Sequence, residues 1–267
     1  MKVLFSGYHN PYFETVTEYA EYALRASGHE VFPFDDRSFL LPGRVRDAVP
    51  SLAQWDLARL NRSLIRLAEA KKPDVCIVSG GHRILPETIR ELRRAGVVTA
   101  LWTIDAPASF DPIKQAAPFY DYVFCGGSEA IGLLKEAGVN AHWLPFACDP
   151  QRHYSIQSKA GIRERWKSTV AFVGSYYPNR ARLFEHLTGY NLGIWGPGWE
   201  KLPETSPLKK HVHRCGPVRP EEWLEIFGST EIVLVAHYQD GTVPCYQASP
   251  KVFEAMAVGL PVLAGAV

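Results

Sequence analysis

Short apolar runs alternate with amphipathic segments of helical length from the first residues of the chain. In the first half the apolar runs predict six strands, at residues 3–6, 29–34, 74–78, 97–104, 122–125 and 141–144. Helical periodicity predicts helices between them, at residues 14–27, 52–70, 86–95 and 129–137. Strands this hydrophobic, alternating with helices, are typical of a parallel sheet covered on both faces. Residues 1–145 therefore predict one doubly wound, Rossmann-like α/β domain.

This alternation is interrupted twice. Residues 35–50, rich in proline, glycine and charge, predict a long loop inside the first domain. Residues 146–168 are polar and predict a linker, after which residues 169–267 repeat the alternation and predict a second Rossmann-like domain. The pattern stops at Val267, directly after a strand. Because a sheet ending there would lack its covering helix, we expect the second domain to be incomplete.

The composition is that of a soluble globular protein. Hydrophobic residues make up 46% and charged residues 21%, which excludes a mostly disordered chain. The 29 Lys and Arg against 28 Asp and Glu leave a net charge of +1, so we expect no nucleic-acid partner. Residues 151–267 carry 13 basic and 10 acidic side chains, and this small excess suits a phosphate-bearing ligand.

Neither metal sites nor targeting segments stand out. The five cysteines include no Cys-x-x-Cys pair, and His211, His213 and Cys215 lack the spacing of a zinc site, so we interpret those three as a buried or edge strand. Residues 7–10 interrupt the first apolar run, which argues against a signal peptide. No stretch reaches the roughly 18 apolar residues of a membrane span. We expect a cytoplasmic protein with no membrane span and no metal.

Two glycine-containing loops follow strands of the first domain, where open α/β sheets bind ligands. Gly7 and His9 follow the first strand, and their turn is able to present N–H groups to a ligand, although an ordinary turn fits equally. Gly80, Gly81 and His82 follow the third strand. Two glycines let the backbone approach a ligand, and a histidine is readily tuned to act as a base near neutral pH. The alternative is a surface histidine in a loop.

A carboxylate ends the fourth strand of the first domain. Asp105 follows a long apolar run and precedes Pro107, and such a carboxylate is costly to bury unless it is paired, hydrogen-bonded or at a cleft. We predict that it deprotonates or binds an acceptor hydroxyl, with turn capping as the alternative. Residues 126–128, Gly-Gly-Ser, predict only a turn and a helix N-cap.

In the second domain, Gly174 and Ser175 stand between an apolar strand and a helix that contains Arg180. This order of strand, glycine, hydroxyl and helix start is able to cradle a phosphate, and an arginine is able to neutralise a diphosphate. Residues 195–199, Trp-Gly-Pro-Gly-Trp, form a rigid loop that serves either as a plain turn or as the border of a base or sugar.

The most informative segment is residues 249–263, SPKVFEAMAVGLPVL. A helix predicted to begin at Pro250 places Lys251 and Glu254 three residues apart on one face. A carboxylate there can accept two hydrogen bonds from a ribose diol, and the lysine can meet a phosphate. The alternative is a surface ion pair worth about 0.3 kcal/mol.

At these residues the chain resembles the GT-B glycosyltransferases, in particular the spore-maturation (CgeB-type) branch of the group 1 glycosyltransferases. Four segments carry the resemblance: 249–265 (SPKVFEAMAVGLPVLAG), 170–187 (VAFVGSYYPNRARLFEHL), 144–154 (LPFACDPQRHY) and 101–107 (LWTIDAP). The resemblance implies two Rossmann-like domains, the first binding an acceptor and the second a nucleotide-diphosphate sugar. It further implies that Glu254 holds the donor's ribose and that Gly174 and Ser175 lie by the diphosphate.

Two positions depart from the family pattern. Lys251 stands where the spore-maturation branch usually has arginine, which keeps the charge but loses bidentate geometry. Tyr246 stands where group 1 enzymes often carry a glutamate that contacts the donor sugar, so the stereochemical outcome stays open. The closing helices of the family, including the one that returns to the first domain, are not found in the sequence.

The sequence thus predicts a hexosyltransferase that uses a nucleotide-diphosphate sugar and an unidentified hydroxyl acceptor. It predicts no cofactor besides the donor, and no metal, because the chain has no Asp-x-Asp pair. Two alternatives remain open: a nucleotide-sugar epimerase of the same architecture, and a non-catalytic nucleotide-sugar binding module.

Overall fold

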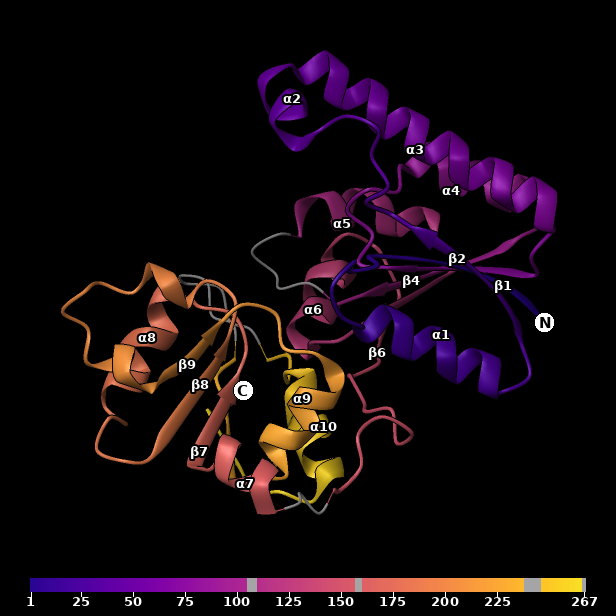
Figure 1. Ribbon diagram of the computed structural model, residues 1–267. Helices are drawn as coiled ribbons and strands as arrows, with labels where there is room; N and C mark the ends of the chain where they lie inside the picture. The colour runs from indigo at the N-terminus through magenta and orange to yellow at the C-terminus, as the bar shows by residue number, and fades with distance from the viewer. Residues whose placement is uncertain (105–109, 157–159, 238–245, 266–267) are drawn as a thin grey trace. The chain divides into compact units, whose positions relative to one another are not determined.

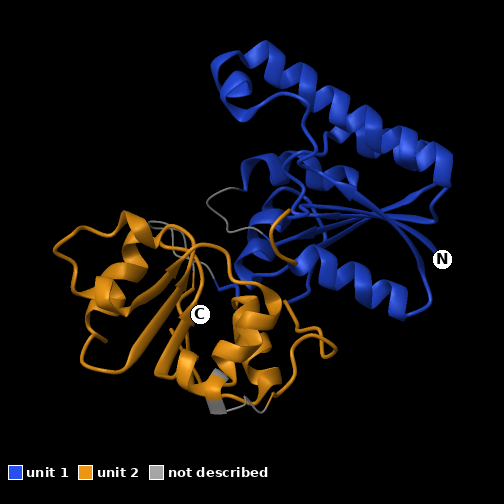
Figure 2. Ribbon diagram, in the orientation of Figure 1, with its two compact units in different colours: residues 1–10, 15–145, 242–247 blue, residues 11–14, 146–241, 248–267 orange. Residues whose placement is uncertain are grey.

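The chain forms two compact units (Figure 2), and the computed structural model describes residues 1–104, 110–156, 160–237 and 246–265. Unit 1 consists of residues 1–10 and 15–145, together with a short segment that ends at Gln247. Unit 2 consists of the rest of the chain, including residues 11–14. Each unit is built around its own parallel sheet.

Unit 1 contains a six-stranded sheet in the order β2-β1-β3-β4-β5-β6 (Figure 1), and every neighbouring pair is parallel. Its strands are β1 Lys2–Gly7, β2 Glu30–Asp35, β3 Val75–Ser79, β4 Val98–Thr103, β5 Tyr122–Cys125 and β6 Ala141–Trp143. These are the six strands that the apolar runs predict. Because all strands are parallel, the loops that follow them gather at one edge of the sheet.

Helices cover both faces of this sheet. They are α1 Val16–Ala26, α2 Gly43–Ala48, α3 Pro50–Lys71, α4 Pro86–Arg94, α5 Asp111–Ala116 and α6 Ser128–Glu136, with a 3₁₀ turn, η2, at Ala117–Phe119. Val3 and Phe5 of β1 pack on the α1 side, whereas Leu4 packs with Leu60 and Leu64 of α3 on the other. The alternation of buried side chains along β1 therefore makes the two cores.

One element was not predicted in this unit's long loop. Residues 35–50, expected to be irregular throughout, contain the short helix α2, which begins after Pro42 and packs on α3. The prediction of a loop over that whole range is wrong. Helix α2 has six residues and no buried side chain, so it lacks the apolar face from which periodicity identifies a helix.

Unit 2 contains a five-stranded parallel sheet in the order β11-β10-β7-β8-β9. Its strands are β7 Ser168–Val173, β8 Leu192–Gly196, β9 Val212–Cys215, β10 Thr230–Val235 and β11 Val262–Ala264. Its helices are α7 Ala160–Trp166, α8 Pro178–Glu185, α9 Pro220–Phe227 and α10 Pro250–Val258, with 3₁₀ turns η3 at Trp199–Lys201 and η4 at Pro207–His211. Helices α9 and α10 cover one core and α8 the other.

The residues of β9 behave as an edge strand. β9 pairs only with β8 among the described strands, which agrees with the interpretation of His211, His213 and Cys215. The Nδ1 atom of His211 lies 3.1 Å from the carbonyl oxygen of Leu192, and the ring of His213 stacks on Trp195 at 4.9 Å. These histidines therefore help to hold β9 in place.

Residues expected to form a linker are packed into unit 2. Trp166, at the end of α7, is buried in the same core as Trp223 of α9 and donates its Nε1–H to Glu225 at 3.0 Å. The ring of His153 meets Trp223 edge-on at 5.3 Å. The aromatic side chains of this polar segment thus anchor it.

Two short segments contact residues distant in the sequence. Glu14, from residues 11–14, accepts a hydrogen bond from Nε of Arg152 at 2.8 Å within unit 2. Gln247 donates its side-chain amide to the carbonyl of Ile104 at 2.8 Å within unit 1. Each unit is therefore completed by residues from the other part of the sequence.

The predicted pair of Rossmann-like α/β domains is confirmed. Within the described part of the chain, no helix combines the length and the apolar character needed to cross a membrane.

Candidate functional site

The first group of predicted site residues lies at the carboxyl edge of the unit 2 sheet. Gly174 and Ser175 follow β7, His237 lies two residues past β10, and helix α10 begins at Pro250. Since β7 and β10 are neighbours in the sheet, the structure brings these segments together. Open α/β sheets bind their ligands at this edge.

The start of α10 is built by its cap. The hydroxyl of Ser249 accepts a hydrogen bond from the N–H of Lys251 at 3.4 Å, and Pro250 takes the first helical position. A Cβ atom added at Gly174 would lie 3.5 Å from Cε of Lys251. The lysine side chain therefore runs along the turn after β7.

Glu254 lies one turn further along α10 and is buried, with 8% of its surface exposed. No hydrogen bond or ion pair joins its carboxylate to another residue of the described chain. His153 is near enough for the Glu254 charge to raise its pKa, but burial lowers that pKa more strongly and keeps the imidazole neutral. A buried carboxylate that accepts no hydrogen bond from the protein is suited to accept hydrogen bonds from the hydroxyl groups of a ligand.

The turn after β7 is supported by the glycine-rich loop after β8. The N–H of Gly174 donates to the carbonyl of Trp195 at 2.8 Å, and the carbonyl of Gly174 accepts from Nε1 of Trp199 at 2.8 Å. Gly196 has φ +141°, and a Cβ there would lie 2.2 Å from the Gly174 carbonyl oxygen. Residues 195–199 therefore form the support of the Gly174 turn.

Arg180 acts as a brace at the same edge. Its Nη1 donates to the carbonyl of Ser175 at 3.0 Å and its Nη2 to the carbonyl of Ala236 at 2.9 Å. The guanidinium also lies over the ring of Tyr177, at 4.7 Å. Burial lowers its pKa. This arginine thus fixes the loop after β7 against the end of β10 and adds positive charge beneath both.

His237 lies at the same edge of the sheet and is not among the residues predicted from the sequence. Its Nδ1 accepts a hydrogen bond from the N–H of Ser249 at 3.2 Å, so the imidazole is unprotonated at Nδ1. The ring also hydrogen-bonds the backbone of Gly265. Burial lowers the pKa of His237, and the charge of Arg180 lowers it further. Its place directly after the apolar run that forms β10 was the available signal.

The second group of predicted residues lies at the carboxyl edge of the unit 1 sheet. Gly7 ends β1, and the ring of His9 folds back so that Nδ1 lies 3.2 Å from the Gly7 carbonyl oxygen. Its Nε2 lies 2.7 Å from Oε1 of the buried Glu21. The hydrogen bond to Glu21 raises the pKa of His9. Both ring nitrogens face acceptors, and this environment favours the protonated form of the ring.

The loop after β3 lies beside that of β1. Gly80 donates its N–H to the carbonyl of Trp102 at 2.9 Å. Gly81 has φ +96°, and a Cβ there would lie 2.6 Å from Leu101, so only glycine fits. His82 follows, half-buried, in the turn before α4. Asp105, predicted at the end of β4, lies outside the described residues.

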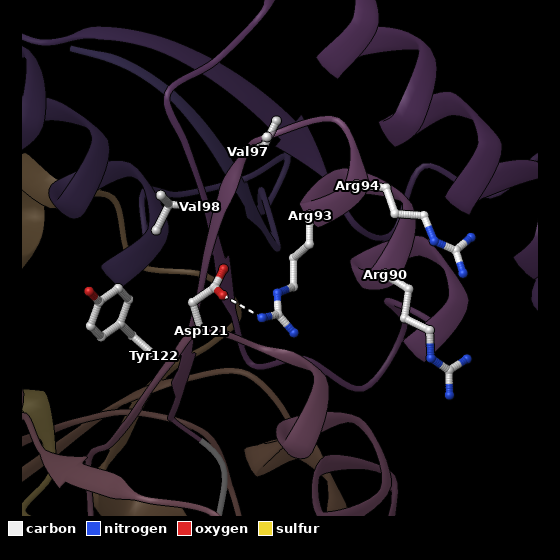
Figure 3. Close-up of a pocket in the computed structure, with 8 residues that line it drawn as sticks. Arg90, Arg93, Arg94, Val97, Val98, Asp121 and Tyr122 are labelled. Atoms are coloured by element: carbon white, nitrogen blue, oxygen red, sulfur yellow. Dashed lines mark ion pairs between the residues drawn. The ribbon is translucent and has the colours of Figure 1, made fainter.

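A shallow pocket of about 580 Å³ lies at the opposite, amino edge of the unit 1 sheet (Figure 3). Arg93 of α4 donates to Asp121 at 2.8 Å and to the Phe119 carbonyl at 3.2 Å. Arg90 pairs with Glu87 at 3.1 Å and lies 4.0 Å over the Phe119 ring. These contacts join α4 to the start of β5, so the arginines serve packing at this edge.

The C-terminal part of the chain is similar in sequence to a known family. Residues 180–267 match a family model described as glycosyl transferase-like, and this range contains Arg180, Lys251 and Glu254. No curated protein sequence matches the chain.

Solved structures share the fold over nearly the whole chain. Sucrose-phosphate synthase from Thermosynechococcus elongatus has a TM-score of 0.68 and 12% identity, covering 98% of this chain and 80% of its own. AviGT4, a glycosyltransferase involved in avilamycin A biosynthesis, has a TM-score of 0.60 and 18% identity, and the match covers 98% of this chain and 78% of AviGT4. UDP-GlcNAc 2-epimerase from Neisseria meningitidis, bound to UDP-GlcNAc, has a TM-score of 0.52 and 12% identity, and the match covers 99% of this chain and 82% of the epimerase. At these identities the likeness defines the fold, and the predicted GT-B architecture of two parallel-sheet α/β domains is confirmed.

Proposed function

We propose that this protein is a glycosyltransferase that moves a hexose from a nucleotide-diphosphate sugar to a hydroxyl acceptor. The observation that carries the proposal is the buried Glu254 carboxylate on the first turns of α10, at the carboxyl edge of the unit 2 sheet. The match of residues 180–267 to a glycosyl transferase-like family and the GT-B fold support it. The CgeB-type branch and a cytoplasmic location are part of the same proposal.

In this proposal unit 2 binds the donor. The Glu254 carboxylate accepts hydrogen bonds from the two ribose hydroxyls. Lys251, beside Gly174, and the backbone at Ser175 stabilise the diphosphate, while Arg180 supports them from below. Positive charge at the leaving diphosphate favours cleavage of the anomeric bond, and the absence of an Asp-x-Asp pair from the sequence supports a metal-independent reaction.

Unit 1 binds the acceptor in this proposal. The loops at Gly7 and at Gly80 and Gly81 border it, together with His9, whose pKa the hydrogen bond to Glu21 raises. His82 or Asp105 takes the proton of the acceptor hydroxyl as its oxygen attacks the anomeric carbon. The bond from that carbon to the diphosphate breaks, and the diphosphate leaves with the electron pair.

The test is donor binding by calorimetry, with UDP and UDP-GlcNAc as first probes and ADP and GDP as further nucleotides. Replacing Glu254 with Ala removes two charge-assisted hydrogen bonds, so we expect affinity to fall about 100-fold. Glu221→Ala, which removes an exposed carboxylate at the start of α9, is the matched control. Unchanged affinity in the Glu254 variant would contradict the ribose-binding role.

The epimerase remains the second candidate, because an epimerase with UDP-GlcNAc bound shares the fold. Incubation of the protein with a donor sugar and no acceptor separates the two. Conversion of the donor to its epimer supports the epimerase, whereas transfer only after an acceptor is added supports the glycosyltransferase. Saturable binding without either reaction supports a binding module.

A further inference from the structure

Five large apolar side chains are exposed at one end of unit 1. They are Leu40, Val45, Val49, Leu52 and Trp55. Leu40 is 64% exposed and Trp55 47%. They belong to helix α2, the loop before it and the first turns of α3, which lie together in Figure 1. Scattered exposed apolar residues are normal, but a contiguous group marks an interaction surface.

These side chains form one patch, here called the α2–α3 tip. Val49, Leu52 and Trp55 follow at intervals of three residues at the start of α3, so they share a helix face. Val45 precedes Val49 by four residues, and the Val49 N–H bonds the Val45 carbonyl at 3.0 Å. The N–H of Leu40 donates to Asp56, the neighbour of Trp55, at 3.0 Å. These backbone contacts hold the loop at Leu40, helix α2 and the start of α3 together.

Hydrogen bonds to the buried Asp56 fix the loop of the tip against α3. Asp56 is fully buried and accepts hydrogen bonds from the N–H groups of Leu40 at 3.0 Å and Leu41 at 2.9 Å, and from Nε of Arg59 at 3.0 Å. Burial alone would raise the pKa of Asp56, but these hydrogen bonds outweigh it and hold the pKa below its usual range. The loop that carries Leu40 is thus fixed with its apolar side chain outward.

Positive charge surrounds the tip. Arg44 is exposed, and Arg46 lies over the ring of Phe39 at 3.8 Å. Arg62 and Arg66, both exposed, continue the face of Trp55 along α3. Within the tip the one acidic side chain is the exposed Asp47, and from residue 48 to residue 68 it is the buried Asp56. An apolar end is thus followed by a cationic stripe on the same side of the helix.

We propose that the α2–α3 tip docks the protein onto an anionic phospholipid surface. Leucine, valine and tryptophan side chains enter the interface, and the arginines meet the lipid phosphates. Tryptophan and arginine both suit this boundary, because each joins an apolar body to a polar group. A second copy of the chain is a poorer occupant, since two such surfaces would bring their arginines face to face. This docking is independent of the reaction proposed above.

Sedimentation with lipid vesicles tests the proposal, comparing pure phosphatidylcholine with phosphatidylcholine that contains about one quarter phosphatidylglycerol. We expect the full chain to bind the anionic vesicles and to be released by high salt. Leu52→Ser with Trp55→Ser should lower the partition coefficient at least about tenfold. Tyr190→Ser, which removes an exposed ring from unit 2, is the matched control and should bind as the unchanged protein does.

A second variant, Arg62→Gln with Arg66→Gln, removes only charge and keeps the apolar tip. It should weaken binding to anionic vesicles and reduce its dependence on salt, which also keeps the test usable if the serine variant fails to fold. Failure of the full chain to bind either vesicle would overturn the proposal, as would equal binding by all variants. A dimer in light scattering that the serine variant abolishes would assign the tip to a second copy instead.

Discussion

The backbone N–H of Ser249 donates a hydrogen bond to Nδ1 of His237 at 3.2 Å. This contact joins His237, two residues past β10, to the cap of α10, the helix that carries Lys251 and Glu254. The ring has an acceptor at Nδ1 only while it is neutral, and burial together with the charge of Arg180 lowers its pKa in that direction. This contact with the helix cap thus requires the neutral form of the imidazole.

Replacing His237 with Ala should weaken nucleotide binding about tenfold, because the Ser249 N–H loses its acceptor. His237→Asn keeps an acceptor near Nδ1, so we expect it to restore most of the affinity, whereas His237→Gln reaches the Gly265 side and should not. Calorimetry with UDP measures the effect. Equal affinity in all three variants would show that the contact does not position the helix.

The same contact predicts a pH dependence. As pH falls through the lowered pKa of His237, protonation of Nδ1 removes the acceptor and nucleotide affinity should fall. His153 and the phosphates of the ligand also titrate, so the informative quantity is the difference between the unchanged protein and His237→Asn. If the two pH profiles coincide, the imidazole is not the titrating group.

Gly196→Ala should destabilise unit 2 by about 3 kcal/mol. The added Cβ would lie 2.2 Å from the carbonyl oxygen of Gly174, at a φ of +141° that other residues rarely adopt. Chemical denaturation measures the change in the free energy of unfolding. Gly189→Ala is the matched control, since a Cβ there meets nothing within 4 Å.

The pair of His9 and Glu21 should stabilise the fold most at low pH. Because the folded pKa of His9 is raised, its contribution is fully present below the unfolded value of about 6.5 and is lost as pH rises through the folded value. The difference in unfolding free energy between the unchanged protein and His9→Gln should therefore be larger at about pH 6 than at about pH 9. A constant difference would mean that the imidazolium form is not what Glu21 stabilises.

Asp56→Asn should cost about 2 kcal/mol of stability at neutral pH, because an amide replaces the charge that accepts two N–H groups and Arg59. The folded pKa of Asp56 is lowered, so its contribution is present above about pH 4 and disappears as pH falls through the folded value. Denaturation curves across that range for both proteins provide the measurement. An exposed carboxylate, changed by Asp47→Asn, is the control.

The strands and their parallel order were predictable because buried parallel strands leave continuous apolar runs, as β1 and β4 do. The burial of Glu254 and the approach of Lys251 to Gly174 follow from the same logic, since both depend on helix phase and strand end. His237 was not assigned from sequence, because its role depends on a contact with Ser249, twelve residues further along the chain. The helix in residues 35–50 was missed because α2 buries no side chain.

The contacts of Arg180 could not be predicted from the sequence. A guanidinium near a glycine-serine turn suggests a phosphate ligand, but in the folded chain it donates to the carbonyls of Ser175 and Ala236. The sequence gives the type of a side chain and its approximate place. Whether a guanidinium binds backbone carbonyls or a ligand depends on distances that only the folded structure gives. The predicted role of His82 stays a prediction, and so does that of Asp105, which lies outside the described residues.

The ion pair of Glu14 and Arg152 joins residues 138 positions apart inside unit 2. A protein fragment beginning at residue 146 would keep the arginine but lose its carboxylate, and one ending at residue 145 would lose the amide that Gln247 gives to Ile104. Dividing the chain at residue 145 therefore removes a contact from each unit, so either unit is better studied with point variants of the intact polypeptide than with truncations.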